Sequence, residues 1–357
     1  MLGISMYLNE EITEQRELYI KKMSEIGFKS IFTSLHIPED DPSLYTDRLK
    51  VLGSLARKYN MELFADISPK SLQYLGYTWE NAEYLQDWGL SGVRVDYGVS
   101  EEVIANLSKK MKIALNASTL TIEGISKLKE YGIQLSSVEA WHNFYPRPET
   151  GLDLEEFNLR NQWLKAEGIK VMAFIPGDGE KRGPLFKGLP TIEDHRELSA
   201  FAAYLDFLKN PFVDKVLIGD PTISEWSEKQ FESLKEGVIE LRAKSVTTDK
   251  KILERINCVL SNRQDAARDV IRAAESRLYG LIGDFPVKAE NTVERPTGSI
   301  TVDNSDYGRY QGEVQITKRN LPIDTKVNVI GKVIDEDLPL LANISGGTKF
   351  RLHWVED

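Results

Sequence analysis

One short stretch, residues 136–152, gathers several side chains that could bind or transform a polar ligand. It reads SSVEAWHNFYPRPETGL and passes from an apolar strand pattern into a loop. Aromatic rings such as Tyr145 can stack on a sugar face, and Arg147 can bind an anion with two parallel hydrogen bonds. Pro146 and Pro148 stiffen the loop around Arg147, which would aim that side chain before a ligand arrives. The alternative is a rigid connection whose polar groups face water.

Other polar residues recur where predicted strands end. In an α/β barrel the active site lies at the carboxyl ends of the strands, so polar residues there indicate function. Strand alternation puts Arg94 and Asp96 on one face, and it puts Glu139, Trp141 and Asn143 on one face. A structural ion pair between Arg94 and Asp96 is the alternative for those two. The candidates at strand ends are Asp66, Arg94, Asp96, Asn116, Glu139, Trp141, Asn143, Asp178 and Asp220.

Two carboxylates across a barrel mouth, together with aromatic rings, are typical of glycoside hydrolysis. One carboxyl group acts as general acid and the other as nucleophile or water-activating base. We expect Glu139 as the acid and Asp96 as the nucleophile or base, with Asp66 and Asp220 as further candidates. Their separation would decide between retention and inversion, and it cannot be obtained from sequence.

The elements that must position these residues form a regular alternation. Short apolar strand patterns alternate with amphipathic helical patterns up to about residue 236, and Gly follows several of the helices before the next strand. Eight such units predict a (β/α)8 TIM barrel rather than a doubly wound sheet, and no glycine-rich nucleotide motif is present. The eight predicted strands are residues 2–8, 29–34, 62–67, 92–97, 112–116, 135–141, 170–175 and 214–218.

The pattern changes in the last third of the chain. We expect a barrel domain over residues 1–238 and a smaller β-rich domain over 239–357. Residues 262–281, rich in Arg and Ala, predict a helix, and strands follow at 298–302, 312–317, 326–333 and 349–355. Between them, a turn-rich segment carries Tyr307 and Arg309. This segment could reach over the barrel mouth or be a plain hairpin turn.

Composition excludes several classes of function. A net charge of −10 and a pI near 5.2 argue against general binding to nucleic acid or to an acidic membrane surface. The single Cys258 suits a reducing compartment, and the four scattered His residues show no zinc spacing. We expect a cytoplasmic protein that needs no metal or other cofactor. The oligomeric state stays open, a homo-oligomer included.

Several motifs together resemble the bacterial 6-phospho-N-acetylmuramidases. They are GISMY at residues 3–7, FTSLH at 32–36, RVDYG at 94–98, NAS at 116–118, HNFYPRPETGL at 142–152 and YGRY at 307–310. The run at 142–152 is highly specific, and the resemblance covers essentially the whole chain. It implies a TIM barrel followed by a cyclophilin-like β-barrel domain, acting in the cytoplasm in peptidoglycan recycling. The substrate implied is the disaccharide N-acetylmuramic acid 6-phosphate–N-acetylglucosamine.

From the residues and this resemblance, we expect a glycosidase that cleaves the β-1,4 bond beside the phosphorylated sugar. A phosphate and a lactyl carboxylate call for cationic residues, and sugar rings call for aromatic ones. Two alternatives stay open: a non-catalytic phospho-sugar sensor, and a metal-assisted sugar-phosphate isomerase or aldolase. The expected substrate-binding residues are Arg94, Asn116, Trp141, His142, Asn143, Tyr145, Arg147, Asp178, Tyr307 and Arg309.

Overall fold

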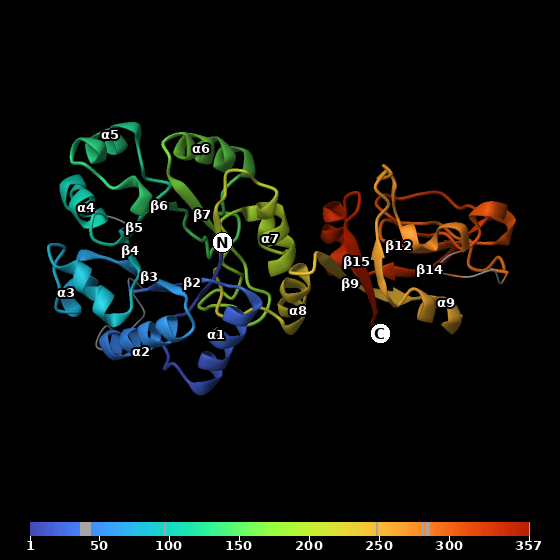
Figure 1. Cartoon of the computed structure of the whole chain (residues 1–357), viewed down its shortest axis with the longest axis horizontal. Helices are drawn as coiled ribbons and strands as arrows, with labels where there is room; N and C mark the ends of the chain where they lie inside the picture. The colour runs from blue at the N-terminus through green and yellow to red at the C-terminus, as the bar shows by residue number, and fades with distance from the viewer. Residues whose placement is uncertain (36–43, 96–97, 248, 280–281, 283–285, 357) are drawn as a thin grey trace. The chain divides into compact units, whose positions relative to one another are not determined.

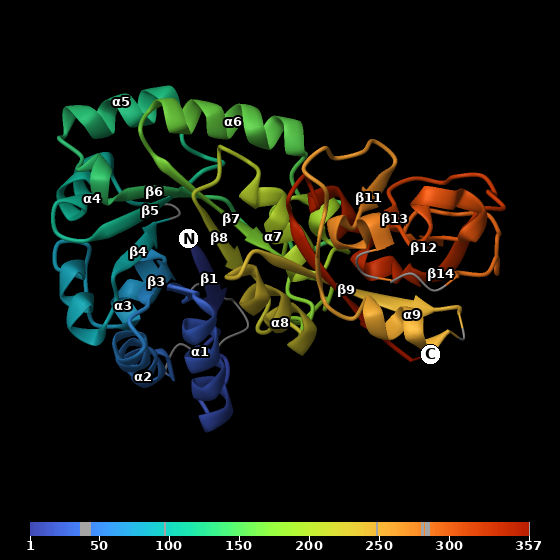
Figure 2. The ribbon, with the colours of Figure 1, turned by 45° about the vertical axis from the view of Figure 1, so that its right-hand side comes forward.

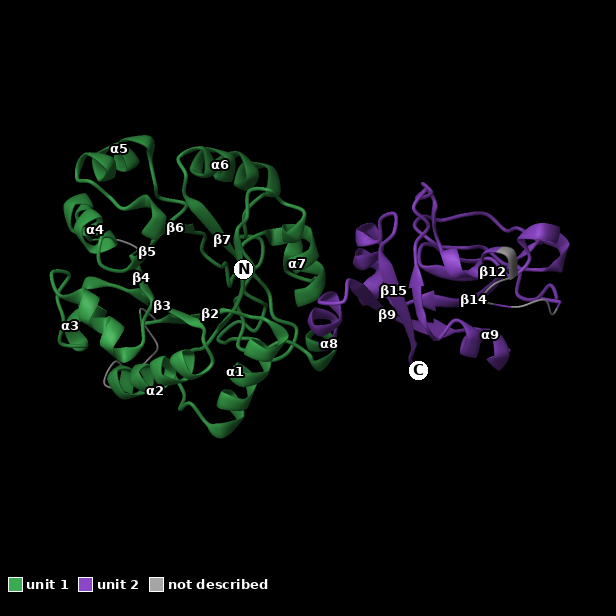
Figure 3. Cartoon of the chain, in the orientation of Figure 1, with its two compact units in different colours: residues 1–228 green, residues 229–357 purple. Residues whose placement is uncertain are grey.

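A computed structural model describes residues 1–35, 44–95, 98–247, 249–279, 282 and 286–356. Within it the chain divides into two compact units, residues 1–228 and residues 229–357 (Figure 3). The candidate catalytic residue Asp96 lies outside the described residues, as does His36, the last residue of the FTSLH motif.

The first unit is built on a closed barrel of eight strands in chain order (Figure 1). Every neighbouring pair of strands is parallel, including β1 with β8, which closes the barrel. The strands are β1 Leu2–Ser5, β2 Ser30–Ser34, β3 Glu62–Ile67, β4 Gly92–Val95, β5 Lys112–Asn116, β6 Val138–Trp141, β7 Lys170–Ile175 and β8 Lys215–Ile218. The predicted TIM barrel is confirmed.

Helices between the strands cover the outside of the barrel (Figures 1 and 2). They are α1 Glu14–Ile26, α2 Tyr45–Lys58, α3 Pro69–Tyr74, α4 Glu101–Ser108, α5 Ile122–Glu130, α6 Leu154–Ala166, α7 Ala200–Leu208 and α8 Glu225–Leu234, with a 3₁₀ helix at Ala82–Trp88. The predicted left-handed glycine at a helix end is confirmed at Gly27, whose φ of 115° is costly for a residue with a Cβ.

Two local predictions were wrong. The run Thr191-Ile192-Glu193-Asp194 resembles a capping box and predicts the start of the seventh helix, but α7 begins at Ala200 with Ser199 as its N-cap. The Thr191 hydroxyl instead accepts a hydrogen bond from Phe174 N and donates one to Asn143 O. The helix expected over 262–281 is replaced in the described residues by strand β11, Val270–Arg272, and a 3₁₀ helix, Ala274–Tyr279. Pairing of β11 with a neighbouring strand outweighs the helix propensity of Ala and Arg.

The barrel interior is filled mainly by aromatic rings. Phe64 and Trp141 lie with ring centroids 4.7 Å apart, and Phe32 and Phe174 lie 5.2 Å apart. Phe144, just beyond the end of β6, packs against this cluster. The barrel interior is therefore a packed apolar core. Polar side chains at the carboxyl ends of the strands lie above this core.

The second unit contains a seven-stranded sheet in the order β10-β15-β9-β14-β12-β13-β11. Only β15 and β9 pair in parallel; the other pairs are antiparallel. The predicted β-rich region is confirmed, and its four predicted strands overlap β12 to β15. The elements are β9 Val238–Ser245, α9 Lys250–Arg255, β10 Val259–Ser261, β12 Ser299–Asp303, β13 Val314–Thr317, β14 Val327–Val333 and β15 Lys349–Trp354.

Candidate active site

Glu139 lies at the amino end of the barrel strands, opposite the end where an active site is expected. It is the second residue of β6 and pairs with Lys170, the first residue of β7. Its carboxylate accepts hydrogen bonds from Lys215 Nζ at 2.8 and 3.0 Å and from Trp141 Nε1 at 2.7 Å. Lys215 is the first residue of β8, is buried, and also contacts Glu62, the first residue of β3. The expectation of Glu139 at the barrel mouth is corrected.

Glu139 lies at the amino end of the barrel because its strand begins later in the sequence than predicted. The sequence suggested a strand from residue 135, but Leu135–Ser137 forms a 3₁₀ turn and β6 begins at Val138. Glu139 therefore stands near the beginning of its strand. There it satisfies a buried ammonium group, which would be costly to leave unpaired.

Replacing Glu139 by Gln should therefore lower stability and spare the chemistry. The variant keeps an acceptor for Trp141 but removes the charge that faces Lys215, so the free energy of unfolding should fall by roughly 1–3 kcal/mol. Urea denaturation would measure this change. Full loss of hydrolysis in folded, thermally stable Glu139→Gln protein would contradict the structural role.

At the carboxyl end, Asp66, Arg94 and Asn143 form one connected cluster. Arg94 donates from Nη1 to Asp66 Oδ1 at 3.0 Å and from Nη2 to Asn143 Oδ1. These residues come from β3, β4 and the segment just after β6, so the barrel brings together positions far apart in sequence. The Arg94 side chain is 5% exposed and that of Asp66 is 14% exposed. Asp66 is thus oriented by a buried cation while part of it stays accessible.

Asn116 ends β5 at the same end of the barrel. It is buried, and its Oδ1 accepts a hydrogen bond from Ser118 N at 2.9 Å, which caps the turn after the strand. The structure therefore places Asn116 close to the expected mouth, with one side-chain oxygen committed to the backbone.

Trp141 and His142 are not at the mouth surface. Trp141 is fully buried in the barrel interior, so its indole is not an open surface for stacking. His142 is also fully buried, and its Nε2 lies 2.7 Å from Asn161 Oδ1 on helix α6, with Phe157 of the same helix beside its ring. Burial lowers the pKa of His142 to about 4, so the ring is neutral at physiological pH. Because successive strand residues alternate, His142 faces the helix layer while Asn143 faces the mouth.

The proline-containing loop after β6 is held by two residues that sequence analysis missed. Arg196 is buried and donates to Tyr145 O at 3.0 Å and to Arg147 O at 3.3 Å. Glu193 accepts from Glu149 N at 2.8 Å and pairs with Arg196. The hydrogen bonds from Arg196 lower the pKa of Glu193 to about 2. The Arg147 side chain remains exposed, so the clamp fixes its backbone and leaves its guanidinium to solvent or a ligand.

Asp220 and Asp178 are engaged in holding loops. Asp220 is fully buried and accepts from three backbone N–H groups, those of Gly177, Arg182 and Leu189, at 2.8 to 3.0 Å. Burial raises the pKa of Asp220, against these hydrogen bonds. Asp178 accepts from Ser224 and Ser227. The two carboxylates expected to act in catalysis and binding therefore organise the loops after β7 and β8.

A cavity of about 540 Å³ opens beside these loops at the ends of β1, β7 and β8. Arg16, Lys181 and Arg182 contribute cationic side chains to its wall, and Tyr7 and Phe186 contribute rings. The guanidinium of Arg182 lies over the Tyr7 ring at 4.3 Å and over the Phe144 ring at 5.9 Å. Because Phe144 follows Asn143 directly, the cavity and the Asp66–Arg94–Asn143 cluster belong to the same end of the barrel.

In the second unit, Tyr307 and Arg309 lie in the 3₁₀ helix Ser305–Tyr310. Arg309 Nη2 donates to the Tyr310 hydroxyl at 2.8 Å, and the rings of Tyr307 and Tyr310 meet edge to face. These contacts are local to the segment, and the two residues stay predicted substrate contacts.

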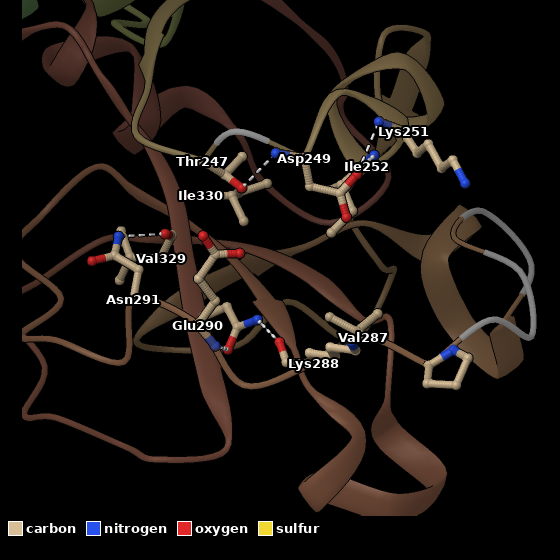
Figure 4. Close-up of a pocket in the computed structure, with 12 residues that line it drawn as sticks. Thr247, Asp249, Lys251, Ile252, Val287, Lys288, Glu290, Asn291, Val329 and Ile330 are labelled. Carbon is tan, nitrogen blue, oxygen red and sulfur yellow. Dashed lines mark hydrogen bonds between the residues drawn. The ribbon is translucent and has the colours of Figure 1, made fainter.

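The second unit also has a smaller cavity of about 240 Å³ (Figure 4). Its amide side chains are used within the fold: Asn291 Nδ2 donates to Val329 O, and Asn328 Nδ2 donates to Lys288 O. We assign no ligand to it. Among the described residues of both units, no group of three His, Cys, Asp or Glu side chains is placed to hold a metal ion. None of the described helices is long and apolar enough to cross a membrane.

Comparison with known proteins matches both units of the chain to domains of the same family. Residues 2–234 match the N-terminal domain of 6-phospho-N-acetylmuramidase, and residues 238–353 match its C-terminal domain. The chain matches no protein of curated function. It is similar to a conserved Enterococcus faecalis protein of unknown function, with 44% identity, coverage of 99% of this chain and 96% of that one, and a TM-score of 0.92.

A second similar structure is an uncharacterized Bacillus cereus protein, with 28% identity, 99% coverage of both chains and a TM-score of 0.74. Both likenesses extend over nearly the full length, so they include the barrel and the β-rich unit together. On the two domain matches, the chain belongs to the 6-phospho-N-acetylmuramidase family.

Proposed function

We propose that this protein is a cytoplasmic glycosidase that hydrolyses the β-1,4 bond between N-acetylmuramic acid 6-phosphate and N-acetylglucosamine. The observation that carries the proposal is the family match over both units. A barrel whose carboxyl end bears a carboxylate, a buried guanidinium and a cationic cavity supports it, because this substrate presents sugar hydroxyls and two anionic groups.

We assign Asp66 as a carboxylate acting at the anomeric carbon. Glycosidases pair two carboxyl groups around a transition state with oxocarbenium character, and a fixed carboxylate stabilises the developing positive charge. Arg94 positions Asp66 by donating a hydrogen bond to its carboxylate, and Asn143 holds Arg94 by accepting a second hydrogen bond from the same guanidinium. Asp96, two residues after Arg94 in sequence, stays the proposed partner carboxylate.

Hydrolysis consumes one water molecule. The general acid donates a proton to the oxygen that leaves with N-acetylglucosamine, the hydroxyl group of water ends on the anomeric carbon, and the other proton of water passes to the carboxylate that acts as base. The exposed guanidinium of Arg147 is proposed to bind the lactyl carboxylate, and the half-buried ring of Tyr145 to contact a sugar face. Their backbones are held by Arg196, so both side chains start from a fixed loop.

An assay with two substrates tests the proposal. Purified protein is incubated with the 6-phosphorylated disaccharide and with its unphosphorylated form, each with and without a chelator, and products are followed by mass spectrometry. We expect release of N-acetylglucosamine from the phosphorylated form only, at the same rate with chelator. Thermal stabilisation by the phosphosugar without cleavage would favour a sensor, and chelator-sensitive conversion of a sugar phosphate would favour an isomerase or aldolase.

A further inference from the structure

We propose that the cavity at the ends of β1, β7 and β8 is the subsite for the phosphoryl group, with Lys181 and Arg182 as its cationic ligands. The inference rests on the proposed function for the identity of the sugar. The anion site itself rests on the side chains that line the cavity.

The first observation is that these two cations are half-buried and, within the described part of the chain, are not paired in a salt bridge, although Lys181 interacts electrostatically with the Asp220 carboxylate. Among the residues that the structure describes, neither Lys181 nor Arg182 forms a salt bridge, although both line the cavity. Arg16, which also lines the cavity, is already paired with Glu10 and donates a hydrogen bond to Tyr7 O. A partly desolvated cation that forms no salt bridge is costly, and an anionic ligand would offset that cost.

The second observation is that Arg182 is positioned before any ligand binds. Its backbone N–H is fixed by buried Asp220, which holds Gly177 and Leu189 as well and so ties both ends of the loop together. Its guanidinium lies over the ring of Tyr7. Stacking on an aromatic face fixes the plane of the guanidinium, and a planar guanidinium can bind phosphate with two parallel hydrogen bonds.

The third observation concerns charge and size. The cavity wall carries Arg16, Lys181 and Arg182 against Glu10 and Glu180, so its balance is positive in a protein whose net charge is −10. A local positive field of this kind selects a small anion over the polyanions that the overall charge repels. A volume of about 540 Å³ accommodates a phosphorylated monosaccharide. The loops after the last two barrel strands are also a frequent phosphate site in this fold.

The test is the double variant Lys181→Met/Arg182→Met, with Lys187→Met as the matched control. Lys187 is an exposed cation of the same loop and does not line the cavity. The backbone N–H of Arg182 that anchors the loop on Asp220 is retained in the double variant. The melting temperature, compared with wild type, checks that the fold is retained.

Two readouts separate this inference from the proposed function. Titration with inorganic phosphate should give a Kd at least about 10-fold higher in the double variant than in wild type and Lys187→Met. In the hydrolysis assay, kcat/KM for the phosphorylated disaccharide should fall about 100-fold or more, mainly through KM, which would remove the preference for the phosphorylated over the unphosphorylated form.

Wild-type affinity for phosphate in the double variant would overturn the subsite, even if the wild-type enzyme hydrolyses the disaccharide. Loss of phosphate binding in a protein that cleaves neither disaccharide would support the subsite and refute the glycosidase. Loss of phosphate binding with no loss of kcat/KM for the phosphorylated disaccharide would overturn the assignment to the phosphoryl group of the substrate.

Discussion

Replacing Asp66 by Asn is expected to reduce kcat for the phosphorylated disaccharide by about 10³-fold or more. The amide keeps the shape of the side chain and can still accept the hydrogen bond from Arg94 Nη1, but it supplies no negative charge at the barrel mouth. The loss should appear in kcat, since the charge matters most when positive charge develops on the sugar. Steady-state kinetics on the phosphorylated substrate would measure it.

The matched control is Glu139→Gln, which removes a carboxylate from the opposite end of the same barrel. If the chemistry belongs to the carboxyl end, this control keeps near-wild-type kcat while losing stability. Thermal denaturation of Asp66→Asn shows whether the fold is intact. A folded Asp66→Asn protein with wild-type kcat would remove Asp66 from the catalytic site.

Replacing Arg196 by Met is expected to cost about 3–5 kcal/mol in the free energy of unfolding. The buried guanidinium donates to four backbone carbonyls, those of Tyr145, Arg147, Lys187 and Gly188, and to both oxygens of Glu193. Methionine fills much of the volume but satisfies none of these acceptors. Urea denaturation should show the loss, with Arg147→Met as the control, because the Arg147 side chain is exposed and its removal should change stability by less than about 0.5 kcal/mol.

The ion pair between Glu193 and Arg196 should make the free energy of unfolding depend on pH. The pKa of Glu193 is lowered to about 2 from its ordinary value of 4.5, so the carboxyl group binds a proton less readily in the folded protein than in the unfolded chain. The stabilisation is therefore fully present above about pH 4.5 and is lost as the pH falls toward 2. Part of the acid sensitivity of the wild type between these values should be absent in Arg196→Met. Equal slopes of stability against pH in both proteins would contradict the clamp.

The fold was largely predictable from sequence because its signals are local. Apolar periods of two and then 3.6 residues mark each strand and helix, and Gly27 marks a helix end that only a left-handed residue can close. The helix expected at 262–281 failed because its strand β11 depends on pairing with β13, more than 40 residues away. The amino-acid composition of residues 262–281 does not indicate that this segment pairs with β13.

The site was predictable only in part, because side-chain direction depends on where each strand begins. The start of β6 at Val138 puts Glu139 at the amino end, while strand alternation turns His142 outward to Asn161. The pairing of Asp66 with Arg94 joins adjacent strands and was missed, although both residues were candidates at the mouth. The position of Asp66 and Arg94 at strand ends identified them as candidates. Which side chains they contact could be learned only from the arrangement of the strands in the closed barrel.

Arg196 and Glu193 show a further limit of sequence reasoning. Their function is to satisfy backbone groups about 50 residues earlier in the chain, around Tyr145 and Arg147. No motif marks such a contact, since the atoms bound belong to the backbone and are the same for any residue. The proline-containing loop could be predicted from its composition. The contacts by which Arg196 and Glu193 hold it could be found only from the three-dimensional structure.

The most direct measurement is hydrolysis of N-acetylmuramic acid 6-phosphate–N-acetylglucosamine by wild type, Asp66→Asn and Glu139→Gln, followed by mass spectrometry. Wild type and Glu139→Gln should release N-acetylglucosamine, and Asp66→Asn should release almost none. Release by Asp66→Asn with none by folded Glu139→Gln would contradict a catalytic centre at the carboxyl end of the barrel. No release by any of the three would contradict the glycosidase itself.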